Sequence, residues 1–268
     1  MRKTRGITFW LGGGLVSFLL AIWLTSLVFI PYDVNEMNIA NRLKGPSLFN
    51  WLGTDNFGRD ILSRIMEGTK TAFAVGAVSV AIGLVGGVAI GAVAGYLGKW
   101  ADELLMRGID ALMAFPGILL ALLLVTLFHP SLFQTMIAIG VLSIPAFARV
   151  SRSSFLQLKE SEFVKAAKGL GAGHLTIIAR HIAPNALSPI IVTATLTFST
   201  SILVEAALSY LGLGVQPPDP SWGRMLNESQ SYMSKAPWFT LAPGVMITIT
   251  VLAFNLLGDG IRDWRESR

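Results

Sequence analysis

Long apolar runs, separated by short polar stretches, form the main pattern along this chain. A helix needs about 20 apolar residues to cross the hydrocarbon core of a bilayer. Phe115-Pro116-Gly117, near the start of the third run, predicts a kink that either lines a transport path or is simply tolerated there. Pro145 in the fourth and shortest run has the same two explanations. The pattern predicts an all-α membrane protein with six transmembrane helices, over Ile7–Ile30, Thr71–Leu97, Ile109–Phe128, Leu132–Ala148, Ala186–Leu211 and Phe239–Leu257.

Basic residues gather at one set of predicted helix ends. If the N-terminus is inside, most of the 21 Lys and Arg residues fall on the cytoplasmic side, among them Arg2, Lys3 and Arg268. The positive-inside rule therefore favours two cytoplasmic termini. The bases left outside are Arg42, Lys44, Arg59, Arg64, Lys70, Arg224 and Lys235. We divide the chain into an N-terminal transmembrane helix (1–30), an outer segment (31–70) and a core (71–268) with an inner polar interval (149–185).

Composition agrees with a membrane protein and excludes other classes. The chain is 53% hydrophobic and 14% charged, whereas soluble domains have about 25% charged residues. It has no cysteine, so disulfides and thiolate metal sites are excluded. The net charge of +5 comes from scattered bases and does not indicate nucleic-acid binding. The first apolar run exceeds the core of a signal peptide, about 7–15 residues, so we expect a retained helix.

Within the inner polar interval, the segment Glu160–Asn185 has the pattern of a helix, a tight turn and a second helix. Helical spacing gives the first helix a small apolar face, formed by Phe163, Ala166, Ala167 and Leu170. Glycine is the usual residue just past a helix C-terminus, and Gly169, Gly171 and Gly173 follow. Pro184 bounds the second amphipathic run, which contains Leu175, Ile177, Ile178 and Ile182. Such a hairpin packs either on its own domain or in a groove of another protein.

Two rows of residues spaced four apart mark predicted helix faces. A stripe without large side chains, formed by Ser79, Gly83, Gly87, Gly91 and Gly95, favours close packing, and we expect it within the chain rather than between subunits. A polar row, formed by Thr193, Thr197, Ser201 and Glu205, fits a wet groove or a tight polar seam. Glu205 falls near the outer surface by helix rise. It is a functional candidate and equally a candidate ion-pair partner of Arg224.

Residues 51–67, WLGTDNFGRDILSRIME, read as a turn and a short amphipathic helix, Asp60–Glu67. Either Asp55 or Asn56 is expected to cap that helix. Arg59 and Arg64 are spaced so that they can form alternating ion pairs with the nearby aspartates. These residues alone predict a solvated, locally paired outer helix.

Four blocks of the sequence resemble the C-type permeases of dipeptide, oligopeptide and nickel ABC importers. GTDNFGRDILSR at 53–64 matches that family's G-T-D-x-x-G-R-D-x-x-S-R signature. Ala166-Ala167, Gly171 and Pro184 have the spacing of the family's EAA loop, although Lys165 and Ala183 stand where Glu and Leu are usual. EAALSYLGLG at 205–214, followed by WG at 222–223, and FNLLGDGIRD at 254–263 match the other two blocks.

The resemblance implies a type I ABC importer permease fold in the bacterial cytoplasmic (inner) membrane. It also implies a second homologous permease subunit, two cytoplasmic ATPase subunits that hold ATP and Mg, and an extracytoplasmic substrate-binding protein. The EAA-like segment would be the coupling helix that docks on the ATPase, through Lys165, Ala166, Ala167, Gly171, Ala172, Gly173 and His174. The resemblance would place the binding-protein contact at Asp55, Arg59, Asp60 and Trp222. The translocation pathway or gate would use Thr193, Thr197, Ser201 and Glu205.

The sequence contains none of the short motifs that mark catalysis, including a P-loop for ATP. His129, His174 and His181 are scattered, so we expect no enzyme activity, metal site or cofactor on this chain. One alternative is an ion-coupled secondary transporter, which would need ionisable groups near the membrane midplane. Another is a non-transporting scaffold. The substrate stays open among dipeptides, oligopeptides and nickel chelates, with residues 24–33 looking slightly more like those of nickel members.

Overall fold

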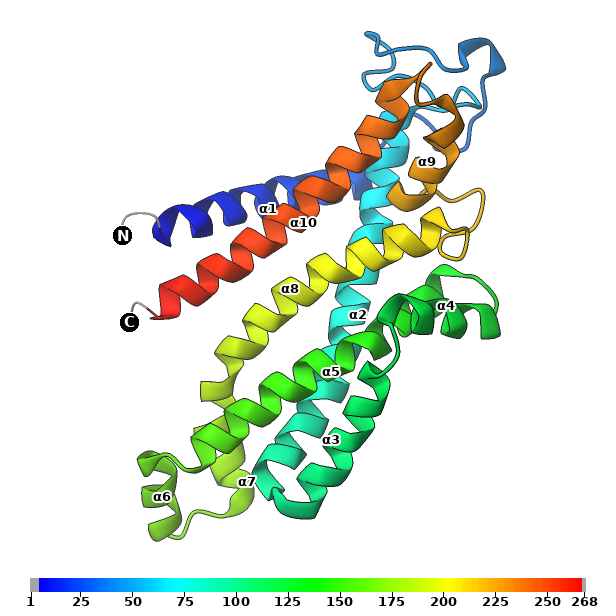
Figure 1. The fold of residues 1–268 in the computed structure, drawn as a ribbon. Coiled ribbons are helices and arrows are strands. Elements are labelled where there is room, and N and C mark those ends of the chain that lie inside the picture. Colours follow the sequence, from blue (N-terminus) through cyan, green and yellow to red (C-terminus); the bar gives the residue numbers. More distant parts are fainter. Residues whose placement is uncertain (1–4, 267–268) are drawn as a thin grey trace.

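The computed structural model describes residues 5–266, and all the secondary-structure elements in that range are helices (Figure 1). Arg2, Lys3 and Arg268, used above for the orientation, lie outside the described residues. The long helices are α1 (Arg5–Val28), α2 (Ile61–Leu97), α3 (Lys99–Met113), α4 (Gly117–Leu127), α5 (Leu132–Lys159), α8 (Ala183–Tyr210) and α10 (Pro237–Glu266). The short ones are η1 (Ile39–Asn41), α6 (Glu162–Gly169), α7 (His174–Thr176), η2 (Ile177–Ile182), α9 (Trp222–Ser229) and η3 (Gln230–Tyr232).

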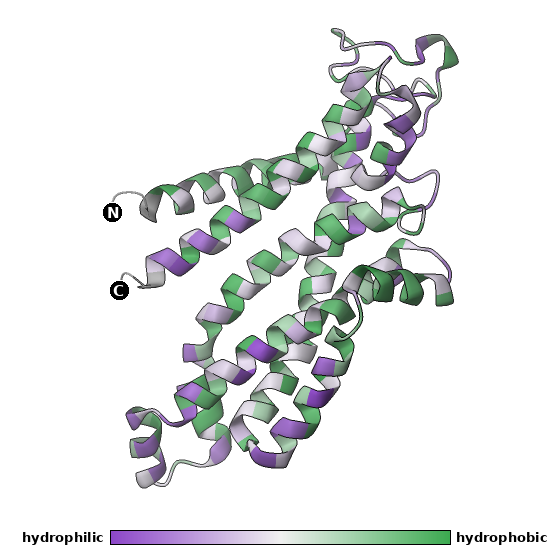
Figure 2. Ribbon diagram, in the orientation of Figure 1, coloured by the Kyte–Doolittle hydropathy of each residue, from purple (hydrophilic) through white to green (hydrophobic). Residues whose placement is uncertain are grey.

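Hydropathy follows this arrangement. Five described helices are long and apolar enough to cross a membrane, and α3 with α4 makes a sixth if that bent pair counts as one span. Figure 2 shows apolar residues along most of the long helices and polar residues concentrated in α3, α6, α9, the C-terminal end of α10 and the outer segment. Helices α1 and α10 lie side by side. The prediction of an all-α membrane protein is confirmed, with the third span broken.

The predicted outer helix and the second span form one helix, α2, because no proline separates Glu67 from Thr71 and Gly68 is accommodated within the helix. Asp60 caps this helix: its carboxylate accepts hydrogen bonds from the backbone N–H of Ser63 and from the Ser63 hydroxyl, both at 2.8 Å. The prediction that Asp55 or Asn56 provides the cap was therefore wrong. The outer segment thus continues directly into a membrane-spanning helix.

The predicted third span is divided into α3 and α4, whose axes meet at 85°. Pro116 precedes α4 and lacks a backbone N–H, and proline disfavours a helical conformation at the residue before it. The kink expected at Phe115-Pro116-Gly117 is confirmed. Two ion pairs hold α3 on α5. Arg152 Nη2 donates to Asp102 Oδ2 at 2.7 Å, and Arg149 Nη2 donates to Asp110 Oδ1 at 2.7 Å.

The glycine stripe of α2 packs against α5, as predicted. A Cβ atom added at Gly87 would lie 2.6 Å from the carbonyl oxygen of Ile144, and one added at Gly95 would lie 2.6 Å from that of Arg152. The two backbones therefore approach too closely for side chains to fit between them. Helix α5 extends to Lys159, well past the predicted end at Ala148, with Pro145 inside it.

Helix α8 continues the second arm of the inner hairpin. The helical path runs from His174 through the π-helical turn η2 to Tyr210 without a break. Pro184 was predicted to bound this arm, but the helical path continues through it, directly after the π-helical turn η2. A continuous helical span of 37 residues therefore joins the inner hairpin to the outer end of the molecule.

Candidate functional site

The inner hairpin consists of α6, a turn and α7 with η2. Val164 of α6 is buried against Ile177 and Ile182 of η2, and Ala167 is also buried. The face opposite them is open, since Phe163 is 44% exposed and Leu170 is 90% exposed. The predicted apolar face is thus partly buried and partly exposed. Ala167 packs within the chain, while the remainder points outward.

The turn after α6 has the hydrogen bonds of a helix stop. The backbone N–H of Ala172 donates to Ala167 O, and that of Gly171 donates to Lys168 O, both at 3.0 Å. Gly171 has φ of +81°, a left-handed conformation that glycine adopts without cost. The prediction that glycine ends this helix is confirmed. Lys165 pairs with Glu162 on the exposed side at 3.0 Å.

Tyr96 attaches this hairpin to α2. A hydrogen bond of 2.6 Å joins the Tyr96 hydroxyl and His174 Nδ1, and the Lys159 ammonium lies 5.9 Å from the centre of the Tyr96 ring. Sequence reasoning missed Tyr96 because it is 78 residues from His174 along the chain. His174 is therefore a residue that positions the hairpin from within the chain.

At the opposite end of the molecule, a buried cluster of charged residues holds the outer segment on α2 and α9. Asp55 accepts from Arg59 Nε at 2.6 Å and lies 3.7 Å from Arg64 Nε. Glu228 of α9 accepts from Arg59 Nη2 at 2.9 Å and from Arg224 Nε at 2.9 Å. We call these five residues the charge cluster. Opposite charges alternate in the cluster, as the local spacing predicted for its first members, but Arg64 Nε is buried without a hydrogen-bond partner.

The charge cluster is not a solvated surface. Asp55, Arg59 and Asp60 are at most 4% exposed, and Trp222 is 1% exposed, with its Nε1 donating to Ile65 O at 3.1 Å. These side chains are therefore buried in the chain rather than presented on an outer surface, and the prediction of a solvated outer helix was wrong. Their physical role is to fasten the outer segment to the membrane helices. Glu228 was missed because no local pattern marks it.

The polar row of α8 is a seam inside the chain. Thr197, Ser201 and Glu205 are buried, so this row does not line an open groove. Glu205 accepts from the Ser209 hydroxyl at 2.6 Å. The suggested ion pair between Glu205 and Arg224 does not form, since Arg224 pairs with Glu228. Thr193, at the inner end of the row, is half-buried, and its hydroxyl donates to Pro189 O at 2.8 Å.

Serine hydroxyls join Glu205 to the loop that follows α8. The backbone N–H of Val215 donates to Ser209 Oγ at 3.1 Å, so one hydroxyl holds both the carboxylate and the loop. Ser221, which caps α9 by accepting from Arg224 N–H at 3.2 Å, is buried close by. Within residues 5–266, no group of three His, Cys, Asp or Glu side chains is arranged to hold a metal ion.

Comparison with known proteins identifies the family. Residues 87–268 match the family described as binding-protein-dependent transport system inner membrane component. The chain belongs to this family. It is 49% identical to the dipeptide transport system permease protein DppC of Alkalihalophilus pseudofirmus over 228 residues, which cover 85% of this chain and 75% of that protein. It is 45% identical to the glutathione transport system permease protein GsiD of Pectobacterium atrosepticum over 252 residues, covering 94% and 84%.

The fold agrees with this assignment. A structure of the MetNI methionine ABC transporter in an inward-facing conformation superposes with a TM-score of 0.62 at 18% identity, covering 76% of this chain and 96% of that chain. The chain is thus a multi-pass permease subunit of an ABC importer in the inner membrane. Its relatives are permease subunits rather than ATPases, and their family works with a substrate-binding protein.

Proposed function

We propose that this permease forms half of the pathway for small peptides, paired with a second homologous permease and two cytoplasmic ATPase subunits. The names of its relatives, a dipeptide permease and a glutathione permease, support a peptide substrate. Glutathione is itself a tripeptide, so both names point to the same chemical class. This favours peptides over the nickel chelates that residues 24–33 suggested.

The inner hairpin is the proposed docking element for the ATPase, on the cytoplasmic side. The observation that carries this proposal is the unpartnered apolar face of α6, where Phe163 and Leu170 point away from the chain. A groove on an ATPase would cover that face. Because the hairpin continues helically into α8, movement of the docked α6 would be transmitted to that helix.

An ion-coupled mechanism has little support. Its best candidate, Glu205, is buried within the subunit and accepts a hydrogen bond from Ser209. A carboxylate that carries ions would need to face a water-filled path. The structure therefore favours a positioning role for Glu205 at the outer end of α8.

Replacing the exposed apolar side chain tests the docking proposal. We expect Leu170→Asp to leave the complex in the membrane and to lower peptide uptake into vesicles at least tenfold, while ATP hydrolysis continues. Leu170→Met is the matched control, since it keeps an apolar side chain at the same position. Gly171→Asp should have the same effect, but its left-handed backbone also adds strain. Wild-type uptake by Leu170→Asp would show that the hairpin is not the docking element.

A further inference from the structure

Residues 46–52 form a loop of the outer segment with an unusual surface. We call it the apolar loop. Leu48 is 92% exposed, Phe49 is 80% exposed and Trp51 is 70% exposed. Exposed apolar side chains that cluster in this way mark a binding surface rather than ordinary surface composition. None of them belongs to the docking hairpin, which lies at the other end of the molecule (Figure 1).

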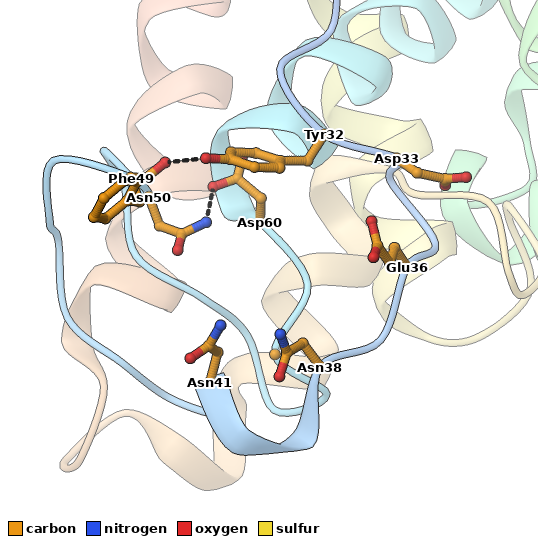
Figure 3. Close-up of a pocket in the computed structure, with 9 residues that line it drawn as sticks. Tyr32, Asp33, Glu36, Asn38, Asn41, Phe49, Asn50 and Asp60 are labelled. Atoms are coloured by element: carbon orange, nitrogen blue, oxygen red, sulfur yellow. Dashed lines mark hydrogen bonds between the residues drawn. The ribbon is translucent and has the colours of Figure 1, made fainter.

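The apolar loop is folded by its own hydrogen bonds. Ser47 N–H donates to Asn50 O at 2.9 Å, and Trp51 Nε1 donates to Leu48 O at 3.2 Å. Asn50 Nδ2 donates to Asp60 at 2.8 Å, which fastens the loop to the cap of α2 (Figure 3). The loop therefore presents apolar side chains outward while its main polar groups are satisfied internally. Such a surface can enter an apolar environment without leaving these groups unpaired.

The two sides of the apolar loop face different environments. On one side lies a polar pocket of about 260 Å³, whose lining includes Asp33, Glu36 and Asn38 (Figure 3). On the other side lies a groove of about 1030 Å³, which the loop shares with α1 and α10. Phe18 of α1 and Phe29, just after α1, line this groove. The apolar loop thus has one side next to a polar pocket and the other side next to an apolar groove.

The walls of this groove indicate what fills it. Helices α1 and α10 are membrane spans, and their groove-lining residues Phe18, Leu241 and Val245 are exposed in the chain. The apolar surface of the spans therefore continues without interruption onto Leu48 and Trp51. Lipid surrounds the exposed faces of membrane-spanning helices, and tryptophan is enriched where hydrocarbon meets the polar headgroups.

We propose that the apolar loop inserts into the interface of the adjacent membrane leaflet and that the groove beneath it holds an acyl chain of a phospholipid. The loop then anchors the outer segment to the bilayer, while the charge cluster fastens that segment to α2 and α9. This inference goes beyond the transport function and does not depend on the substrate. It holds whether or not the inner hairpin docks on an ATPase.

The natural absence of cysteine makes a direct test simple. Leu48→Cys carries a nitroxide label in the assembled transporter, reconstituted in vesicles of phosphatidylethanolamine and phosphatidylglycerol. Spin relaxation is then measured with oxygen, which concentrates in lipid, and with a water-soluble nickel chelate. Ile39→Cys is the matched control, because Ile39 is also highly exposed in the outer segment but does not line the groove.

We expect the label at Leu48 to collide at least fivefold more often with oxygen than with the chelate, and the label at Ile39 to show the reverse preference. Chelate access at both positions would show a water-exposed loop and overturn the proposal. Low access to both reagents at Leu48 would mean that a protein covers the loop, which would also overturn it. A second measurement uses lipids brominated on the acyl chain, which should quench wild-type tryptophan fluorescence more than that of Trp51→Phe.

Discussion

Glu228→Gln removes one negative charge from the charge cluster with little change in shape. Glu228 accepts hydrogen bonds from Arg59 and Arg224 at 2.9 Å and lies 3.4 Å from Arg64 Nη2. After the substitution, the three guanidinium groups face Asp55 as the remaining carboxylate of the cluster. Arg64 is fully buried, so water cannot compensate for the lost charge.

The size of the effect follows from burial. Removing one partner of a buried ion pair costs about 3–5 kcal/mol. Glu228 keeps a little solvent contact, and the glutamine oxygen still accepts a hydrogen bond, so we take the lower limit, about 3 kcal/mol. This free energy affects local opening of the outer segment, because Arg59 joins that segment to α9. A change of about 1.4 kcal/mol is a factor of ten, so opening should become about 100-fold more frequent.

Hydrogen exchange of backbone amides measures this opening. The amide of Asp55 donates to Arg59 O at 3.0 Å, and the amide of Ile61 donates to Gly53 O at 3.1 Å, so both are protected until the segment opens. We expect both to exchange about 100-fold faster in Glu228→Gln, in keeping with the local free-energy change.

The control is Glu67→Gln, which breaks a pair of similar length but much greater exposure. Glu67 and Lys70 are joined at 2.7 Å with side chains 31% and 29% exposed. Exposed pairs contribute about 0–1 kcal/mol, so exchange in the outer segment should rise less than about fivefold. If Glu228→Gln changed exchange no more than Glu67→Gln does, the charge cluster would not hold the segment.

Two further predictions concern the helix contacts. Gly87→Leu should destabilise the α2–α5 packing by about 1–3 kcal/mol and lower the melting temperature. Gly13→Leu is the control, because a Cβ at Gly13 would meet nothing within 4 Å, and equal melting temperatures for the two variants would contradict the close approach of α2 and α5. Glu205→Gln should retain uptake, because an amide oxygen can still accept from Ser209. Glu205→Leu instead removes the acceptor of the Ser209 O–H, at a cost of about 1–3 kcal/mol. Loss of uptake in Glu205→Gln, measured in vesicles with the ATPase present, would instead favour ion coupling.

The boundaries of the predicted spans show where sequence reasoning reached its limit. Hydropathy found the apolar runs correctly, because each is set by neighbouring residues. Hydropathy placed the start of the second span at Thr71, whereas α2 begins at Ile61. The first turns of α2 carry charged side chains, which are buried through contacts with residues far away in the sequence. Arg59 pairs with Glu228, which is 169 residues away. No local window contains both residues.

The sequence by itself determined the helical membrane class, the family, the glycine stop of α6 and the stripe of α2. Each of these depends on residue types at short, regular spacing, which fix local conformation and the composition of a helix face. Only the tertiary structure decided which polar faces are covered. It buried the outer signature residues and the seam at Glu205, and it left the apolar faces at Leu170 and Leu48 open. Burial depends on contacts between segments far apart in the chain, and periodicity within one segment carries no information about them.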